Sequence, residues 1–200
     1  MRVGAVNEGT GNRRQGTGNT RAVFLDRDGV INEDTGYVSR PEDFLFLPGV
    51  IDALAEIQRL GYSLVIVTNQ SGIGRGQYTG ADYERVTRHM LAGLASGGIK
   101  IAAVRHCPHA PEAGCRCRKP APGMILDAQR VHDLDLAQSW LVGDKSSDIE
   151  AAHRAGIHKT LRIKSPYADD PAHAQPLFVG DSLAAIIPQL RAEAAGGPGK

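Results

Sequence analysis

The sequence predicts an α/β protein in which helices cover both faces of a mostly parallel sheet. From residue 21 onward, short apolar segments typical of strands alternate with longer segments whose apolar residues recur at helical spacing. One short segment, YSLVIVTN at residues 62–69, is a continuous apolar run rich in β-branched residues, as expected for a strand buried on both faces. Strands separated by helices of this length form βαβ units, which build a Rossmann-like three-layer α/β/α sandwich.

The elements are expected in the following order. The strands should cover residues 21–25, 62–69, 99–107, 139–143, 158–163 and 176–179. The helices should cover residues 49–61, 81–96, 122–134, 146–156 and 181–190. Helical spacing of the apolar residues from Val50 to Leu60 indicates the first helix, and Gly61 is suited to end it. Pro188 predicts a short or kinked last helix, and no connection is long enough for a large cap domain.

Composition indicates one soluble domain. The chain has 200 residues, of which 42% are hydrophobic, and a net charge of +1. This near-neutral charge argues against binding to nucleic acid or a membrane surface. No apolar run approaches the roughly 18 residues of a membrane span, and the start of the chain lacks the apolar core of a signal peptide. We therefore expect a cytoplasmic monomer with a disordered glycine-rich tail at residues 1–20, a single domain at residues 21–192 and a frayed end at residues 193–200.

Acidic side chains follow two of the predicted strands. Asp26 and Asp28 come directly after the strand at residues 21–25, and Asp144 comes after the strand at residues 139–143. Ligands of parallel α/β sheets bind at the carboxyl ends of the strands, so these carboxylates and Thr68, near the end of another strand, are expected at one edge. Three carboxylates there would repel one another by several kcal/mol unless a cation lay between them.

Oxygen-rich surroundings without sulfur favour Mg²⁺ as that cation. Beside it, Asp26 could attack phosphorus to form an aspartyl phosphate, and Asp28 could exchange protons with the leaving oxygen and the attacking water. Taken alone, the two aspartates are equally well explained by a turn in which they accept hydrogen bonds from backbone amides. An EF-hand is excluded, because a loop counted from Asp26 would need Gly and Glu where Ile31 and Tyr37 stand.

The glycine-rich segment SGIGRG at residues 71–76 does not predict a dinucleotide site. Its glycines are spaced G-x-G-x-G, whereas the dinucleotide fingerprint is G-x-G-x-x-G at the start of a helix. The segment also follows the second predicted strand rather than the first, and the chain contains no P-loop pattern. We therefore reject a nicotinamide cofactor.

All three cysteines lie with a histidine in the segment CPHAPEAGCRCRKP at residues 107–120. In extended backbone, Cys107 and His109 would point to the same face, and so would Cys115 and Cys117. Three thiolates and one imidazole make a closed, tetrahedral structural zinc site. Because the spacing C-x-H-x5-C-x-C departs from the usual C-x-x-C pairs, three unrelated thiols are the alternative. A disulfide is disfavoured by the odd number of cysteines and the cytoplasmic setting.

Such a zinc ion would stiffen the loop and hold the next two residues, Arg118 and Lys119, in place. A pair of basic residues on a surface is common. After a strand and beside a metal-stapled loop, however, the pair is typical of phosphate ligands. The zinc is expected to be structural and to take no part in the chemistry.

Four segments together resemble the motifs of the haloacid dehalogenase phosphatases: FLDRDGV, VTNQSG, CRKP and VGDKSSDIEAA. They occur in that family's order, and the resemblance spans about residues 21–190. The short zinc loop narrows the resemblance to the histidinol-phosphate and heptose-bisphosphate phosphatases, and LDRDGVINEDTGYV and TNQSGIGRG match the heptose-bisphosphate members. The resemblance implies a Mg²⁺-dependent phosphatase that removes the C7 phosphate of a heptose 1,7-bisphosphate through an aspartyl phosphate. The heptose 1-phosphate formed would serve nucleotide-activated heptose synthesis, for lipopolysaccharide or another glycan.

The resemblance also implies roles for individual residues. Asp26 would be the nucleophile and Asp28 the general acid/base, while Thr68 and Lys119 would stabilise the transferred phosphoryl group. Mg²⁺ would be held by Asp26, the backbone carbonyl of Asp28, and Asp144, with Asp148 behind them. The zinc ligands would be Cys107, His109, Cys115 and Cys117. The substrate would be contacted by Arg27, Asp34, Thr35, Gly36, Tyr37, Asn69, Gln70, Ser71, Arg118 and Lys145.

The sequence is also compatible with two other hypotheses. Within the enzymes, the chain could be a histidinol-phosphate phosphatase or another small phosphomonoesterase. In a different class, it could be a catalytically dead fold that uses the zinc loop to bind nucleic acid or protein. The 5% aromatic content and dispersed charge disfavour nucleic acid, and the complete set of motifs disfavours a dead enzyme.

Overall fold

The computed structural model describes residues 20–166 and 174–195. Its centre is a six-stranded sheet in the order β3-β2-β1-β4-β5-β6, and every neighbouring pair is parallel. The strands are β1 (Ala22–Leu25), β2 (Ser63–Asn69), β3 (Ile101–Cys107), β4 (Trp140–Gly143), β5 (Lys159–Ile163) and β6 (Phe178–Gly180). The α/β sandwich expected from the sequence is confirmed, and no connection among the described residues carries a large cap domain.

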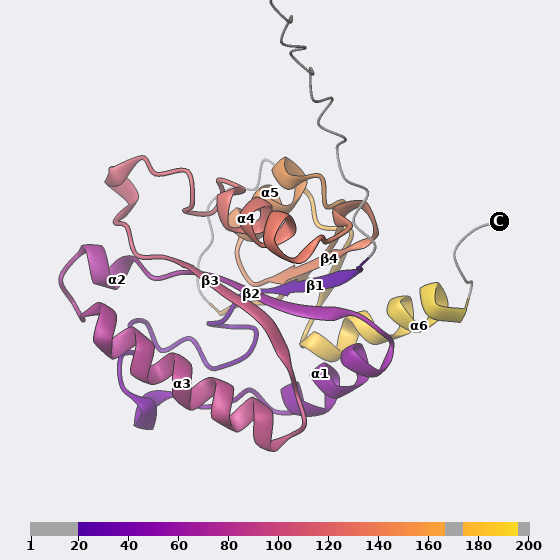
Figure 1. Cartoon of the computed structure of the whole chain (residues 1–200), viewed down its shortest axis with the longest axis horizontal. Coiled ribbons are helices and arrows are strands. Elements are labelled where there is room, and N and C mark those ends of the chain that lie inside the picture. The colour runs from indigo at the N-terminus through magenta and orange to yellow at the C-terminus, as the bar shows by residue number, and fades with distance from the viewer. Residues whose placement is uncertain (1–19, 167–173, 196–200) are drawn as a thin grey trace, which may run out of the picture.

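Helices cover both faces of the sheet (Figure 1). On one face lie α4 (Gly123–His132) and α5 (Ser146–Ala155). On the other lie α1 (Val50–Arg59), α3 (Gly80–Ser96) and α6 (Ile187–Ala195). A one-turn helix, α2 (Ser71–Gly74), follows β2, and short 3-10 turns occupy residues 41–43, 111–113, 136–138 and 183–186. Not one of the helices in the described ranges is long and apolar enough to cross a membrane.

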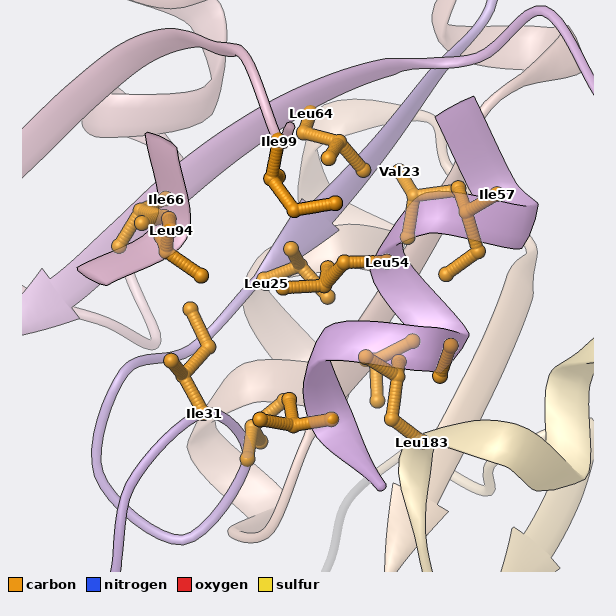
Figure 2. Packing of buried hydrophobic residues seen from close by; sticks show 14 of the residues in the cluster. Val23, Leu25, Ile31, Leu54, Ile57, Leu64, Ile66, Leu94, Ile99 and Leu183 are labelled. Carbon is orange, nitrogen blue, oxygen red and sulfur yellow. The ribbon is translucent and has the colours of Figure 1, made fainter. Parts of the chain in front are cut away.

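Alternate residues of the central strands enter two separate hydrophobic cores. Val23 and Leu25 of β1 pack on the side of α1 and α3, whereas Ala22 and Phe24 pack on the side of α4 and α5. Figure 2 shows the first core, where side chains of α1 such as Leu54 meet those of β1 and β2. Because side chains alternate along a strand, apolar residues at every position are what burial on both faces requires.

The strand register brings the ends of the central strands to one edge. Leu25 of β1 is aligned with Ile66 of β2 and with Val142 of β4. The carboxyl ends of β1 and β4 therefore lie side by side, and β2 continues beside them to Asn69 along β3. This is the carboxyl edge, where parallel α/β sheets bind ligands.

The C-terminal part differs in detail from the expectation. Pro188 is the second residue of α6 rather than a break inside it, and a 3-10 turn at residues 183–186 precedes this helix. The first helical turn needs no intrahelical amide donor, so proline is tolerated there. The helix continues to Ala195, into the segment expected to be frayed, and Thr20 forms a parallel bridge to Leu134. The rest of the two expected tails, residues 1–19 and 196–200, lies outside the described residues.

Candidate active site

Asp26 ends β1 with a carboxylate held against a buried lysine. The Nζ of Lys119 lies 3.0 Å from Oδ1 of Asp26 and 2.5 Å from Oδ1 of Asp148, and it donates to the carbonyl of Val67 at 2.8 Å. All three charged side chains are buried. Burial opposes the charge on Lys119, but the carboxylates of Asp148 and Asp26 outweigh it and raise the pKa of the lysine. The ammonium therefore stays charged and orients both carboxylates.

Asp144 completes a cluster of three carboxylates with Asp26 and Asp148, whose oxygens lie within 4.8 Å of one another. Neither oxygen of Asp144 has a hydrogen-bond partner among the described residues. Burial and the charges of Asp26 and Asp148 raise the pKa of Asp144 to about 7. A buried carboxylate without donors, beside two others, is the environment that a hard cation such as Mg²⁺ satisfies. The donor set thus fits the metal site expected from the sequence.

The loop that carries Asp28 packs closely on this cluster at Gly29. The backbone of Gly29 has φ +79°, and a Cβ there would lie 2.7 Å from Oδ2 of Asp144. Only glycine combines this left-handed backbone with the space needed by the carboxylate. The D-x-D-G pattern therefore has a steric as well as a chemical basis.

Replacing Asp144 by Asn should stabilise the protein in magnesium-free buffer above neutral pH. The folded-state pKa of about 7 lies above the ordinary value of 3.8, so the stability that protonated Asp144 contributes is complete below about pH 4 and is lost as pH rises through 7. Asn carries no charge to be repelled. We expect its advantage over the wild type in thermal unfolding to grow between pH 5 and pH 8 by on the order of 2 kcal/mol.

Added Mg²⁺ should raise the melting temperature of the wild type but not that of Asp144→Asn. A variant less stable than the wild type at pH 8 without Mg²⁺ would show that the carboxylate cluster is not electrostatically strained.

Asp28 accepts hydrogen bonds from its own set of donors. Arg27 donates from Nη2 to both carboxylate oxygens at 2.9 and 3.0 Å and from Nε to Oδ1 at 3.1 Å, and Asn32 donates to Oδ1 at 2.9 Å. Arg27 itself is only 1% exposed, with its guanidinium 6.0 Å from the Tyr83 ring centroid. Asp28 engages Nε and Nη2 of Arg27, whereas the buried Nη1 has no hydrogen-bond partner among the described residues. The expected contact of Arg27 with the substrate stays a prediction.

Asn69 ties the end of β2 to the segment that carries Lys119. Its side-chain amide donates to the carbonyl of Lys119 at 3.1 Å and accepts from the backbone N–H of Lys119 at 3.0 Å. Neighbouring Thr68 is buried, and its hydroxyl accepts a hydrogen bond from Gln70 at 3.0 Å. The end of β2 therefore fixes the lysine through its backbone as well as lining the site.

A cavity of about 810 Å³ opens over these residues. Of the positions expected from the sequence, it is lined by Asp26, Asp28, Asp34, Gly36, Tyr37, Thr68, Asn69, Gln70, Ser71, Arg118, Lys119 and Lys145. Arg27, Thr35 and Asp144 are not part of its lining. Residues that the sequence analysis did not identify complete the wall: Tyr78, Pro111, Pro120, Ser146, Ser147, Glu150 and Arg154. Of these, Ser146, Ser147 and Glu150 lie within the motif VGDKSSDIEAA and Pro120 lies within CRKP, although the motifs assigned them no role. Arg154 follows two residues after the first of these motifs, near the end of α5.

The basic side chains of the cavity differ in how they are paired. Lys145 lies 3.1 Å from Asp34, which belongs to the loop after β1, and Arg154 pairs with Glu150 on α5. Arg118 also lines the cavity, and its Nη1 has no hydrogen-bond partner among the described residues. Unlike Lys145 and Arg154, Arg118 has no ion-pair partner among the described residues, which makes it a candidate for an incoming anion.

The cysteine loop closes into a compact group of four potential metal ligands. The Sγ of Cys117 lies 3.3 Å from Nδ1 of His109 and 3.3 Å from the sulfurs of Cys107 and Cys115. A tetrahedral zinc site has ligand–ligand edges of about 3.5–3.8 Å, given Zn–S bonds of about 2.3 Å. All three cysteines are free thiols. The four residues expected from the sequence are thus brought together in an arrangement that could hold one metal ion.

The thiols cannot all ionise without a cation. Burial and the neighbouring thiols Cys117 and Cys115 raise the pKa of Cys107 to about 12. Burial also raises the pKa of Cys115, but hydrogen bonds from Cys117 and from the backbone of Arg118 outweigh it and lower that pKa to about 6. One thiolate is accommodated by its neighbours, and three require a bound cation.

A parallel sheet whose first strand ends in Asp-x-Asp, with a lysine on the first aspartate and further carboxylates after the fourth strand, defines a haloacid-dehalogenase-like hydrolase. The family model described as "HAD-hyrolase-like" matches residues 116–186. Heptose-specific relatives match more of the chain. The D-glycero-beta-D-manno-heptose-1,7-bisphosphate 7-phosphatase of Photorhabdus laumondii subsp. laumondii is 45% identical over 172 residues, which cover 82% of this chain and 91% of the relative. The chain belongs to the family of these heptose-bisphosphate phosphatases.

A second sequence relative and a solved structure support the same family assignment. The protein of the same name from Escherichia coli (strain K12) is 43% identical over 151 residues, covering 72% of this chain and 79% of the relative. The crystal structure of D,D-heptose 1,7-bisphosphate phosphatase from B. bronchiseptica, complexed with magnesium and phosphate, superposes with a TM-score of 0.76 at 34% identity. That superposition covers 87% of this chain and 99% of the other.

Proposed function

We propose that this enzyme removes the C7 phosphate of D-glycero-D-manno-heptose 1,7-bisphosphate through an aspartyl-phosphate intermediate. The observation that carries the proposal is the cluster of Asp26 with Lys119 and with the carboxylates of Asp144 and Asp148, beneath a cavity that Asp26 and Lys119 line. The relatives supply the substrate, since several carry its name. The product, heptose 1-phosphate, would feed the synthesis of nucleotide-activated heptose for lipopolysaccharide or another glycan.

In the first step Asp26 attacks phosphorus with a carboxylate oxygen. A bond forms between that oxygen and phosphorus, the bond between phosphorus and the C7 oxygen breaks, and Asp28 gives its proton to the departing oxygen. Lys119 and Thr68 stabilise the phosphoryl oxygens during the transfer. Asp26, Asp144 and the backbone carbonyl of Asp28 would hold Mg²⁺, which would supply positive charge to offset the charge of those oxygens.

In the second step a water molecule attacks the phosphorus of the aspartyl phosphate. Asp28, now a carboxylate, accepts a proton from this water, and the carboxylate of Asp26 leaves. The enzyme returns to its starting state with inorganic phosphate released. The same residue therefore acts as acid and then as base.

The three thiols and the imidazole of the cysteine loop are proposed to hold a structural Zn²⁺ ion. This assignment is supported by the separations among Cys107, His109, Cys115 and Cys117. The loop they close leads directly into Arg118 and Lys119, so the metal keeps the cavity wall in place. Three reduced thiols in one metal site also favour a cytoplasmic setting, where we place the enzyme as a monomer.

Arg118 is proposed to bind the second phosphate, and substitution tests this role. A phosphomonoester brings about two negative charges and a sugar bisphosphate about four, so cations beyond the transfer site are needed. We expect Arg118→Ala to lower kcat/KM for the heptose bisphosphate roughly ten- to a hundredfold more than for p-nitrophenyl phosphate, because a charge-assisted hydrogen bond contributes about 1.5–3 kcal/mol. Arg116→Ala, an exposed position in the same loop, is the matched control.

Equal losses on both substrates would place Arg118 at the transferred phosphoryl group or in the fold. Faster hydrolysis of histidinol phosphate than of the bisphosphate by the wild type would assign the enzyme to the histidinol-phosphate phosphatases instead.

A further inference from the structure

Gln70 has a buried side chain whose every polar atom is engaged. Its Nε2 donates to Oδ2 of Asp28 at 3.1 Å and to Oγ1 of Thr68 at 3.0 Å. Its Oε1 accepts from the hydroxyl of Tyr78 at 2.6 Å. The side chain thus bridges the acid/base, a phosphoryl-binding hydroxyl and a tyrosine on the cavity wall.

Tyr78 determines which end of the Gln70 side-chain amide faces Asp28. A glutamine can turn its amide over, exchanging donor and acceptor at little cost in shape. In the reversed orientation Oε1 would face the Asp28 carboxylate, which has no proton to offer when ionised. The hydroxyl of Tyr78 favours the observed orientation because it donates to Oε1. Tyr78 therefore influences the position of Asp28 indirectly, through the side-chain amide of Gln70.

The glycine-rich segment after β2 makes this arrangement possible. A Cβ on Gly72 would lie 2.1 Å from Cε1 of Tyr78, so the ring packs directly against the backbone of α2. Any side chain at position 72 would displace the ring. Within the segment that does not form a dinucleotide site, Gly72 thus has a physical role in placing Tyr78.

We propose that Gln70 and Tyr78 are positioning residues that hold the Asp28 carboxyl in the orientation needed for proton transfer. The inference rests on the proposed function, because it takes Asp28 as the acid/base of the phosphatase. It gives Gln70 a role in addition to the substrate contact expected from the sequence. Arg27 and Asn32 fix one side of Asp28, and Gln70 fixes the other, on the side of Thr68.

A series of aryl phosphates with leaving groups of different acidity tests this role without the sugar. The value of kcat/KM reports steps up to departure of the leaving group. A good leaving group departs without a proton, whereas a poor one depends on the acid. We expect Gln70→Ala to lower kcat/KM about tenfold or more for phenyl phosphate and less than about threefold for p-nitrophenyl phosphate. Tyr78→Phe should also lower kcat/KM more for phenyl phosphate than for p-nitrophenyl phosphate. The losses should be smaller than in Gln70→Ala, because this substitution removes one hydroxyl and keeps the ring.

The double variant shows whether Tyr78 acts through Gln70. In the Gln70→Ala background, Tyr78→Phe should have almost no further effect, as expected for two residues in one chain of contacts. The matched control is Tyr62→Phe, which also removes a buried hydroxyl that donates to a side chain, here Glu193 at 2.8 Å, near the opposite end of β2. It should leave the dependence on the leaving group unchanged.

Parallel losses across the whole series, or additive effects in the double variant, would overturn the positioning role. A loss confined to the heptose bisphosphate would make Gln70 a substrate contact and would overturn it as well. If the wild type released phosphate neither from the aryl phosphates nor from the heptose bisphosphate, the proposed function would fail instead. The two failures are therefore distinguishable.

Discussion

Asp26→Asn is expected to lower the rate of phosphate release by about four orders of magnitude or more. An amide cannot attack phosphorus, so the covalent route is closed, and removal of a nucleophile typically costs this much or more. The substitution also leaves Lys119 with one anionic partner, Asp148, in place of two. Asn has nearly the same shape as Asp, so the fold should persist. Steady-state phosphate release and acid-quench trapping of the phosphoenzyme provide the measurement.

Asp28→Asn is the matched comparison, because it changes the same group two residues away. It should still form some phosphoenzyme, particularly from p-nitrophenyl phosphate, but should hydrolyse it slowly because the base is missing. Trapped phosphoenzyme should therefore accumulate in Asp28→Asn and be undetectable in Asp26→Asn. Near wild-type turnover by Asp26→Asn would rule out the covalent mechanism.

The layered fold could be predicted from the sequence because its signals are local. The strand at residues 62–69 is apolar on both faces, and the structure places β2 inside the sheet between β1 and β3. The course of the C-terminal part was less predictable. Pro188 can either kink a helix or begin one, and the choice depends on the 3-10 turn that precedes it.

The site was predictable where the chemistry requires residue types at fixed spacing. Asp26, Asp28 and Asp144 follow apolar strands, and strand ends converge whatever the loops between them do. The partners of these groups depend on side-chain direction instead. The sequence does not indicate that the Arg27 side chain bonds to Asp28. Nor does it indicate that Tyr78 packs on Gly72 and donates to Gln70. Such contacts are set by packing around the loop.

Loss of one cysteine from the proposed zinc site is the second large effect that we expect. Cys107 lies in the hydrophobic core with α4, so its substitution would also disturb packing. Cys115 and Cys117 are partly exposed, which makes Cys115→Ser the cleaner test of the metal. Structural zinc contributes its binding free energy to folding, and we expect a loss of on the order of 3 kcal/mol or more. For a chain of this size that corresponds to a fall in melting temperature of roughly 6–12 °C.

Elemental analysis after extensive dialysis should find one zinc per chain in the wild type and in Arg116→Ala, and less in Cys115→Ser. A mild chelator should abolish the wild-type activity reversibly, with Mg²⁺ alone restoring it while the zinc remains bound. Because ligand thiols must lose their protons, zinc retention should weaken as pH falls, chiefly through Cys107, whose pKa is raised to about 12 without metal. A zinc-free wild type, or an unchanged melting temperature in Cys115→Ser, would show that the four side chains are neighbours without a metal.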